Sequence, residues 1–271
     1  MLPMHPCIYP DLSDTEYHTD PAIGSTTAVV GLDNEPLLLA RLRGEVVTED
    51  KPCFVSGRLM HMAVLEPDRF RELVVSEGPI NPRTNAPYER GTKAFARWQE
   101  ANPHLTMVDP WIHAAIKAMP APVRGIFALD GTAEASVFLE RNGARYKCRP
   151  DWWLFESNTF FDLKSISTGG GSIERAIDKA IRARSYWFTI AWYRAVIFHA
   201  LGLIHGCKLI FVEKEPPHRW RIVDLDFDYL ALGDEKVCQM MDKIERGNLG
   251  ETADDIFYQS AAPQYLIESE E

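Results

Sequence analysis

The sequence contains no apolar run long enough to cross a bilayer. Its most apolar stretch, Ala195 to Ile204, includes His199 and falls far short of the roughly 20 residues that a membrane span needs. The first ten residues carry no basic segment followed by an apolar block, so a secretory signal is not indicated. We therefore expect a cytoplasmic protein that does not associate with a membrane.

Paired cysteines are missing too. The five cysteines stand far apart with no C-x-x-C spacing: Cys7, Cys53, Cys148, Cys207 and Cys238. An odd number of widely spaced cysteines argues against a disulfide framework, a structural zinc site and an iron–sulfur cluster. We expect buried, reduced thiols.

Positive charge is scarce overall but is concentrated in one segment. The chain has a net charge of −10, which is unusual for a protein that handles nucleic acid. Between Arg141 and Arg184, however, nine basic residues stand against five acidic ones, so this segment carries +4. Such a local concentration suits phosphate binding, although a solvated helix face would give the same pattern.

Apolar periodicity and turn residues predict an α/β fold, with a helical N-terminal portion at about 1–120 and a sheet core at about 130–225. After an extended lead-in, helices are expected over Ala28–Leu32, Leu37–Leu42, Phe54–Leu65, Lys93–Glu100, Trp111–Met119, Ser172–Arg184, Tyr186–Leu201 and Asp234–Arg246. Strands are expected over Glu134–Glu140, Arg145–Phe155, Thr159–Ser167, Lys208–Val212 and Arg219–Asp224. Gly78–Tyr88 is predicted to be a mobile loop. With no repeat or clear linker, we expect one domain over 1–265 and an acidic tail at 266–271, disordered at Glu268–Glu271.

Three charged residues stand out within two apolar strands. Asp162 and Lys164 occupy positions i and i+2 of a strand, so their side chains share one face. A turn at 156–158 would fold the preceding strand back and place Asp151 opposite them. The spacing therefore predicts two carboxylates and one ammonium group on one small patch.

Two carboxylates that lie close together repel each other unless a cation or a shared proton relieves them. Mg²⁺ prefers hard oxygen ligands, and with one or two carboxylates it can activate water and neutralise charge on a phosphodiester. Lys164 would then orient or help deprotonate that water, or stabilise the pentacoordinate phosphorus. The alternative is a surface salt bridge between Asp162 and Lys164. Because the flanking residues are largely aromatic and apolar, the charges need a partner or a function, which favours the metal site.

The motif Pro150-Asp151 followed by Asp162-Leu163-Lys164 resembles the PD-(D/E)XK nuclease superfamily. Further segments resemble the RecE-like exodeoxyribonuclease VIII nuclease domain, of the RecB-like branch, in the same order: Tyr9 to His18, Gly57 to His61, Val64 to Phe70, Ala133 to Ser136 and Cys148 to Asp151. The resemblance covers roughly residues 8 to 200, and its motifs are specific only as a set.

The resemblance implies a restriction-endonuclease-like core, a mixed sheet flanked by helices. It identifies Asp151 and Asp162 as metal ligands, Lys164 as the catalytic lysine, and His61 as a histidine that supports the metal site. Glu134 matches an acidic residue before the hairpin, and could be a ligand, a residue that orients one, or an exposed strand residue. Without the resemblance, His61 would be interpreted as a core or capping histidine.

One position departs from the family pattern. RecB-like nucleases usually carry Gln-x-x-x-Tyr on the helix after the lysine strand, where this chain has Thr189 and Tyr193. Threonine is shorter than glutamine and cannot make its paired amide contacts, which puts the usual contact to site or substrate in doubt. Alternatively, both residues simply pack the helix.

Two further groups are candidates for DNA contact. Arg175, Lys179, Arg182 and Arg184 on the preceding helix suit backbone phosphates. An aromatic cluster could stack against bases, although a core position is favoured for most of its members: Tyr186, Trp187, Phe188, Trp192 and Tyr193.

The resemblance implies an ATP-independent, Mg²⁺-dependent 5′→3′ exonuclease on double-stranded DNA ends, with Mn²⁺ as a substitute cation. The absence of a G-x-x-x-x-G-K-[ST] segment agrees with independence from ATP. The family further implies 3′ single-stranded tails for phage-type homologous recombination, a ring-shaped homo-oligomer and a single-strand-annealing recombinase as partner. The alternatives are an endonuclease or defence nuclease on the same fold, and a catalytically weakened DNA-binding protein.

Overall fold

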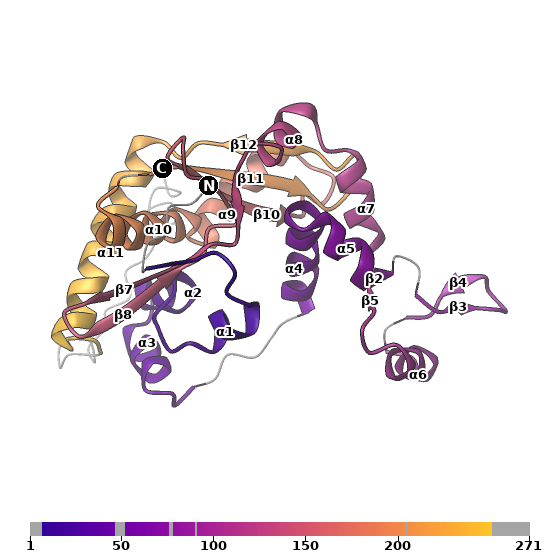
Figure 1. Ribbon diagram of the computed structural model, residues 1–271, viewed down its shortest axis with the longest axis horizontal. Coiled ribbons are helices and arrows are strands. Elements are labelled where there is room, and N and C mark those ends of the chain that lie inside the picture. The colour runs from indigo at the N-terminus through magenta and orange to yellow at the C-terminus, as the bar shows by residue number, and fades with distance from the viewer. Residues whose placement is uncertain (1–6, 47–51, 76–77, 90, 204, 251–271) are drawn as a thin grey trace, which may run out of the picture.

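The structure, a computed structural model, describes residues 7–46, 52–75, 78–89, 91–203 and 205–250 (Figure 1). The acidic tail expected at 266–271 lies outside these residues. Among the described residues, no helix is both long enough and apolar enough to cross a membrane.

A five-stranded sheet forms the centre of the molecule, in the order β12 (Trp220–Val223), β11 (Gly206–Glu213), β10 (Thr159–Ile166), β9 (Trp152–Leu154) and β6 (Thr132–Ala133). Strands β10 and β11 are parallel, and the other pairs are antiparallel. A parallel pair needs a crossover connection, which here contains α9 (Ile173–Ala183) and α10 (Tyr186–Leu201). The mixed sheet with flanking helices confirms the predicted fold class.

Helices cover both faces of this sheet because β10 and β11 alternate their apolar side chains between two cores. On one face, Phe160 and Phe211 pack with α9, α10 and α11 (Phe227–Arg246). On the other, Leu163 and Ile210 pack with α4 (Pro52–Leu65), α7 (Pro110–Lys117) and α8 (Ala121–Phe127). Figure 1 shows these groups on opposite sides of the sheet. Asp162 and Lys164 alternate in phase with Phe160, so these charged side chains of β10 lie on the face that α10 covers.

A second, antiparallel sheet packs against α10 and consists of β1 (Ile8–Tyr9), β7 (Ser136–Arg141) and β8 (Ala144–Cys148). Two predicted strands are therefore wrong in extent. Glu134–Glu140 is broken at Glu134, which has a left-handed φ of 47°, and Arg145–Phe155 is broken at residues 149–151. In both cases the chain leaves one sheet for the other, and Pro150 has no N–H to continue a ladder.

The helical N-terminal portion begins earlier than the sequence suggested. Where an extended lead-in was expected, Ser13 and Glu16 form a capping box that starts α1 (Asp14–Thr19). Pro67 ends the predicted helix but also begins the next. The remaining helices of this portion are α2 (Ser25–Ala28), the 3₁₀ turn η1 (Val29–Leu32), α3 (Glu35–Leu42) and α5 (Pro67–Leu73).

An arm projects beyond α4 and α5 in Figure 1. It contains α6 (Lys93–Ala101) and the short pairs β2 (Val74–Val75) with β5 (Thr106–Met107) and β3 (Ile80–Asn81) with β4 (Ala86–Pro87). The predicted loop Gly78–Tyr88 thus contains a small hairpin.

Candidate metal and catalytic site

The two breaks in the strands lie side by side, and each carries a carboxylate. The backbone N–H of Glu134 donates to the carbonyl oxygen of Asp151 over 3.0 Å. This bond joins the segment that leaves β6 to the segment that enters β9. The chain therefore brings two acidic side chains to the junction of the two sheets.

The carboxylate of Asp151 is held by two contacts. Its Oδ2 accepts from the Leu163 N–H over 2.5 Å, and its Oδ1 lies 3.2 Å from Nδ1 of His61. The predicted turn is confirmed. Because Phe161 pairs with Trp152, the next residues in this register, Asp162 and Asp151, lie beside each other. Burial raises the pKa of Asp151, but the charges of His61 and Lys164 and these hydrogen bonds outweigh it, so the pKa lies below its ordinary value.

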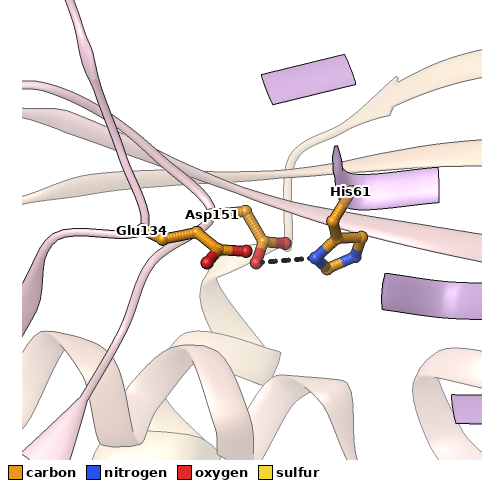
Figure 2. A group of neighbouring side chains, drawn as sticks. All are labelled: His61, Glu134 and Asp151. Atoms are coloured by element: carbon orange, nitrogen blue, oxygen red, sulfur yellow. Dashed lines mark ion pairs between the residues drawn. The ribbon is translucent and has the colours of Figure 1, made fainter. Parts of the chain in front are cut away.

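His61 reaches the site from α4, on the far side of β10. Its Nε2 lies 2.9 Å from the carbonyl oxygen of Leu163, so Nε2 is the nitrogen that donates. Burial lowers the pKa of His61, but Asp151 and Asp162 raise it above the ordinary value on balance. When His61 is neutral, Nδ1 keeps its lone pair and points at the carboxylates (Figure 2).

His61, Glu134 and Asp151 each offer a ligand atom, and these atoms lie within 4.8 Å of one another. Figure 2 shows the three side chains converging from separate segments of the chain. We call these three residues the crossover group, because Glu134 and Asp151 lie where the chain passes from one sheet to the other. Burial and the negative charges of Asp151 and Asp14 raise the pKa of Glu134 to about 7, so this carboxyl lacks a full counter-charge. Of the alternatives for Glu134, the structure places it with the other candidate ligands.

Asp162 and Lys164 form a second group, which we call the strand group. They share one side of β10 as predicted, with Lys164 Nζ 2.5 Å from Asp162 Oδ2. Neither carboxylate oxygen accepts a hydrogen bond of acceptable geometry within the described residues, although Asp162 is only 1% exposed. Burial raises the pKa of Asp162 to about 6 despite the ammonium group. The negative charges of Asp162 and Asp151 overcome burial and raise the pKa of Lys164.

These residues fit a divalent cation. A buried carboxylate that has one ammonium group beside it and no well-oriented hydrogen-bond donor is costly, and a cation is one partner that lowers the cost. The donor set of carboxylates and one imidazole suits Mg²⁺ or Mn²⁺ better than a soft metal. Asp151, Glu134 and His61 could hold such an ion, with Asp162 beside them.

Thr189 and Tyr193, the two residues compared with the Gln-x-x-x-Tyr pattern, both lie on α10. Tyr193 is half-buried and its ring centroid lies 6.0 Å from that of Phe160 on β10. Thr189 is one turn earlier on the same helix face and is also half-buried. Phe188 and Trp192 are fully buried, which confirms the core interpretation for these two aromatic residues.

Three basic residues of α9 lie on its exposed face, and a fourth is exposed at the residue that ends the helix: Arg175, Lys179 and Arg182 on the face, and Arg184 at the end. The opposite face buries Ile173, Ile177 and Ile181. Arg184, at the end of α9, donates to the hydroxyl of Tyr186 over 3.1 Å. The positive row therefore reaches the neighbourhood of Lys164, and its contact with DNA stays a prediction.

Sequence reasoning overlooked Arg149. Its guanidinium is buried and donates to Ser136 Oγ at 2.8 Å and to Asp14 Oδ1 at 2.7 Å, and it lies 3.6 Å from Glu134 Oε2. It thereby fastens α1 to the acidic side chain of the crossover group. The available signal was an arginine directly before Pro150-Asp151 in otherwise apolar strand sequence.

Comparison with known proteins agrees with this fold. The family described as "PDDEXK-like domain of unknown function (DUF3799)" matches residues 32–253. A crystal structure from Eubacterium rectale, named "Putative exonuclease", has a TM-score of 0.57 and 12% identity, over 96% of this chain and 99% of that chain. At this identity the likeness concerns the fold. No curated protein matches the sequence.

Proposed function

Because the chain belongs to the family of PDDEXK-like domains of unknown function (DUF3799), and thus to the PD-(D/E)XK nuclease superfamily, we propose that it is a metal-dependent exodeoxyribonuclease. The observation that carries the proposal is the carboxylate of Asp162. It is buried and paired with the Lys164 ammonium group, with Nζ 2.5 Å from its Oδ2, yet neither oxygen accepts a hydrogen bond of acceptable geometry among the described residues. A nuclease centre explains this costly arrangement, whereas a structural ion pair does not.

Each residue then has a role. Asp151, Glu134 and Nδ1 of His61 would hold Mg²⁺ or Mn²⁺, and the Nε2–H of His61 is fixed by the Leu163 carbonyl. Asp162, which is not one of these three clustered residues, would join as a further ligand. The cation supplies activation of water and neutralisation of charge on the phosphodiester. Lys164 orients that water or donates to the phosphoryl oxygen, because its ammonium is the positive side chain next to Asp162.

The finer activity we propose is 5′→3′ degradation of double-stranded DNA from its ends, without ATP. The RecE-like motifs and the name of the structural neighbour support an exonuclease. The exposed basic face of α9 supports backbone contacts to the duplex. A ring-shaped homo-oligomer, a single-strand-annealing recombinase as partner and a role in phage-type recombination belong to the same proposal.

The test uses purified protein with linear duplex DNA labelled at either the 5′ or the 3′ end. With Mg²⁺ we expect release of nucleotides from the 5′ ends, and no release after chelation of the cation. Asp162→Ala and Lys164→Ala should each reduce kcat/KM at least about 10³-fold, as expected for loss of charge stabilisation at the reacting phosphate. Unchanged cleavage by either variant would refute the site.

Two other outcomes of this test would each support an alternative function. Nicking of covalently closed circular DNA would identify an endonuclease on the same scaffold, since an exonuclease needs an end. Thr189 motivates the other alternative, a weakened enzyme kept for binding. Binding of duplex DNA that is independent of Mg²⁺ and without turnover would favour that alternative.

A further inference from the structure

The ammonium group of Lys164 lies over an aromatic ring. Its Nζ is 5.5 Å from the centroid of the Tyr186 ring, within the range of a cation–π contact. That ring is itself held by the core, because its centroid lies 6.0 Å from that of Phe211 on β11. Tyr186 is thus a rigid surface against which the lysine side chain rests.

The hydroxyl group of Tyr186 is tied to the basic row of α9. Arg184 Nη1 donates to it over 3.1 Å, and only Ser185, in a left-handed conformation with φ 50°, separates the two residues. The sharp link between α9 and α10 therefore turns Arg184 and Tyr186 toward each other. Arg184 carries five N–H donors, so this bond leaves others to face solvent.

We propose that Tyr186 is a positioning residue for Lys164, and that Arg184 fixes Tyr186 while binding a phosphate of the DNA substrate. The inference rests on the proposed nuclease function and deepens it. The aromatic ring selects one position of the ammonium group beside Asp162, and Arg184 makes that position depend on bound substrate.

A lysine needs such a support because its four-carbon stem is flexible and its ammonium group is a point charge without directional preference. Lys164 is 20% exposed and also approaches its neighbour's backbone, with Nζ 3.4 Å from the Leu163 carbonyl oxygen. A neutral ring restricts these positions without adding a charge that would compete with a cation for the carboxylates. Asp162 alone attracts the ammonium group but does not fix its direction.

The kinetic test separates the ring from the hydroxyl. Tyr186→Leu removes both, and kcat should fall about tenfold with KM within about twofold of the wild type, as for a lost contact at the reacting group. Tyr186→Phe keeps the ring, and kcat should fall only about twofold. Wild-type kcat in Tyr186→Leu, or an equal loss in Tyr186→Phe, would overturn the positioning role.

Arg184, which contacts Tyr186, is tested against Arg175, an exposed arginine near the other end of α9. Arg184→Gln should raise KM and also lower kcat about twofold, whereas Arg175→Gln should raise KM alone. In the Tyr186→Phe background, Arg184→Gln should lower kcat no further, because the hydroxyl contact is already gone. Additive losses in kcat would contradict the coupling.

A measurement without turnover separates this inference from the proposed function. In protein with ¹⁵N- and ¹³C-labelled lysine, the resonances lost in Lys164→Gln identify Lys164. Its side-chain signals should show an upfield ring-current shift in the wild type and Tyr186→Phe, but not in Tyr186→Leu. Equal shifts in all three would overturn the inference even if DNA is cleaved. The expected shifts in a protein without nuclease activity would leave the positioning intact and reject the function alone.

Discussion

The crossover group and the strand group are neighbours, yet they hold their carboxylates in opposite ways. Asp151 accepts a backbone N–H from β10 and faces the imidazole of His61, so its negative charge is satisfied and its pKa is lowered. Asp162 has the Lys164 ammonium group but no well-oriented donor among the described residues, and its pKa is raised to about 6. The carboxylate of Asp151 stabilises the fold, whereas burial of the Asp162 carboxylate destabilises it. Such a cost in stability is expected at a site that is selected for function rather than for stability.

Substitution of Asp151 should therefore lower the free energy of unfolding, whereas substitution of Asp162 and Lys164 together should not. Asp151→Leu leaves the Leu163 N–H and His61 without their partner, and we expect a loss of about 3 kcal/mol in the free energy of unfolding. Asp162→Leu combined with Lys164→Met replaces a poorly oriented buried ion pair by apolar groups, which should be neutral or stabilising by about 1–4 kcal/mol. Urea denaturation without divalent cations measures both.

Both variants should lack nuclease activity, so activity cannot explain the contrast in stability. Asp162→Leu alone serves as the control, since it leaves Lys164 without its carboxylate and should be less stable than the double variant. If the double variant unfolded as easily as Asp151→Leu, the distinction between the two groups would be lost.

The two groups should also respond together to pH. Glu134 and Asp162 titrate near pH 7 and pH 6 in the fold but lower when unfolded, so the unfolded state loses these protons first as pH rises. The stability that they contribute when protonated is therefore lost between about pH 4 and pH 7. His61 acts in the same direction, because its raised pKa gives stability that is present below pH 6.5 and lost as pH rises through the folded value.

A divalent cation should reverse this trend, because it binds the deprotonated ligands. We expect the Tm without metal to fall from pH 5 to pH 8, and the increase in Tm caused by Mg²⁺ to grow over the same range. Thermal denaturation with Mg²⁺ and with a chelator, at matched ionic strength, measures the difference. A Mg²⁺ effect that is constant with pH would mean that these groups do not bind the cation.

The sequence was sufficient for the strand group and insufficient for the crossover group. Alternation along one strand placed Asp162 and Lys164 together, and the turn at 156–158 fixed the register toward Asp151. The break at 149–151 was hidden, because residues on both sides of it favour strands and only the tertiary structure assigns them to different sheets. Glu134 was misplaced on a strand for the same reason.

Contacts between segments that are far apart in the sequence also could not be predicted from it. His61 reaches Leu163 across about a hundred positions of sequence, and Arg149 reaches Asp14 across a similar distance, so neither contact follows from local spacing. His61 was proposed from the family resemblance, whereas Arg149 stood within the matched segment Cys148 to Asp151 without being given a role. Local patterns therefore predicted the fold class and half of the site, and packing determined the rest.

A smaller effect should come from the exposed face of α9, which lies outside both groups. Lys179→Gln and Arg182→Gln remove exposed charges from the same row, and each should raise KM about threefold and lessen the salt dependence of DNA binding by about one ion. Arg246→Gln is the matched control, since Arg246 is an exposed arginine on α11 that pairs with Asp242. An equal effect in this control would mean that α9 is no special surface for DNA.

The smallest expected effect concerns Thr189, and it tests whether the burden on Asp162 can be relieved from within the chain. Along β10, Phe160 contacts Tyr193 and Lys164 contacts Tyr186, so Asp162 lies at the level of Thr189 on α10. Threonine leaves the carboxylate without a well-oriented donor, whereas a glutamine amide has the length to donate to it. Thr189→Gln should therefore raise the Tm without metal by a few degrees, since one satisfied buried carboxylate is worth about 1 kcal/mol or more. Activity should change by no more than about threefold in either direction, because the amide would order Asp162 and also compete with the cation for it.

Thr189→Val, which has nearly the same shape and no donor, should leave both the Tm and the activity unchanged. A rise in Tm with valine equal to that with glutamine would show that packing, and not the orphaned carboxylate, limits stability at this position.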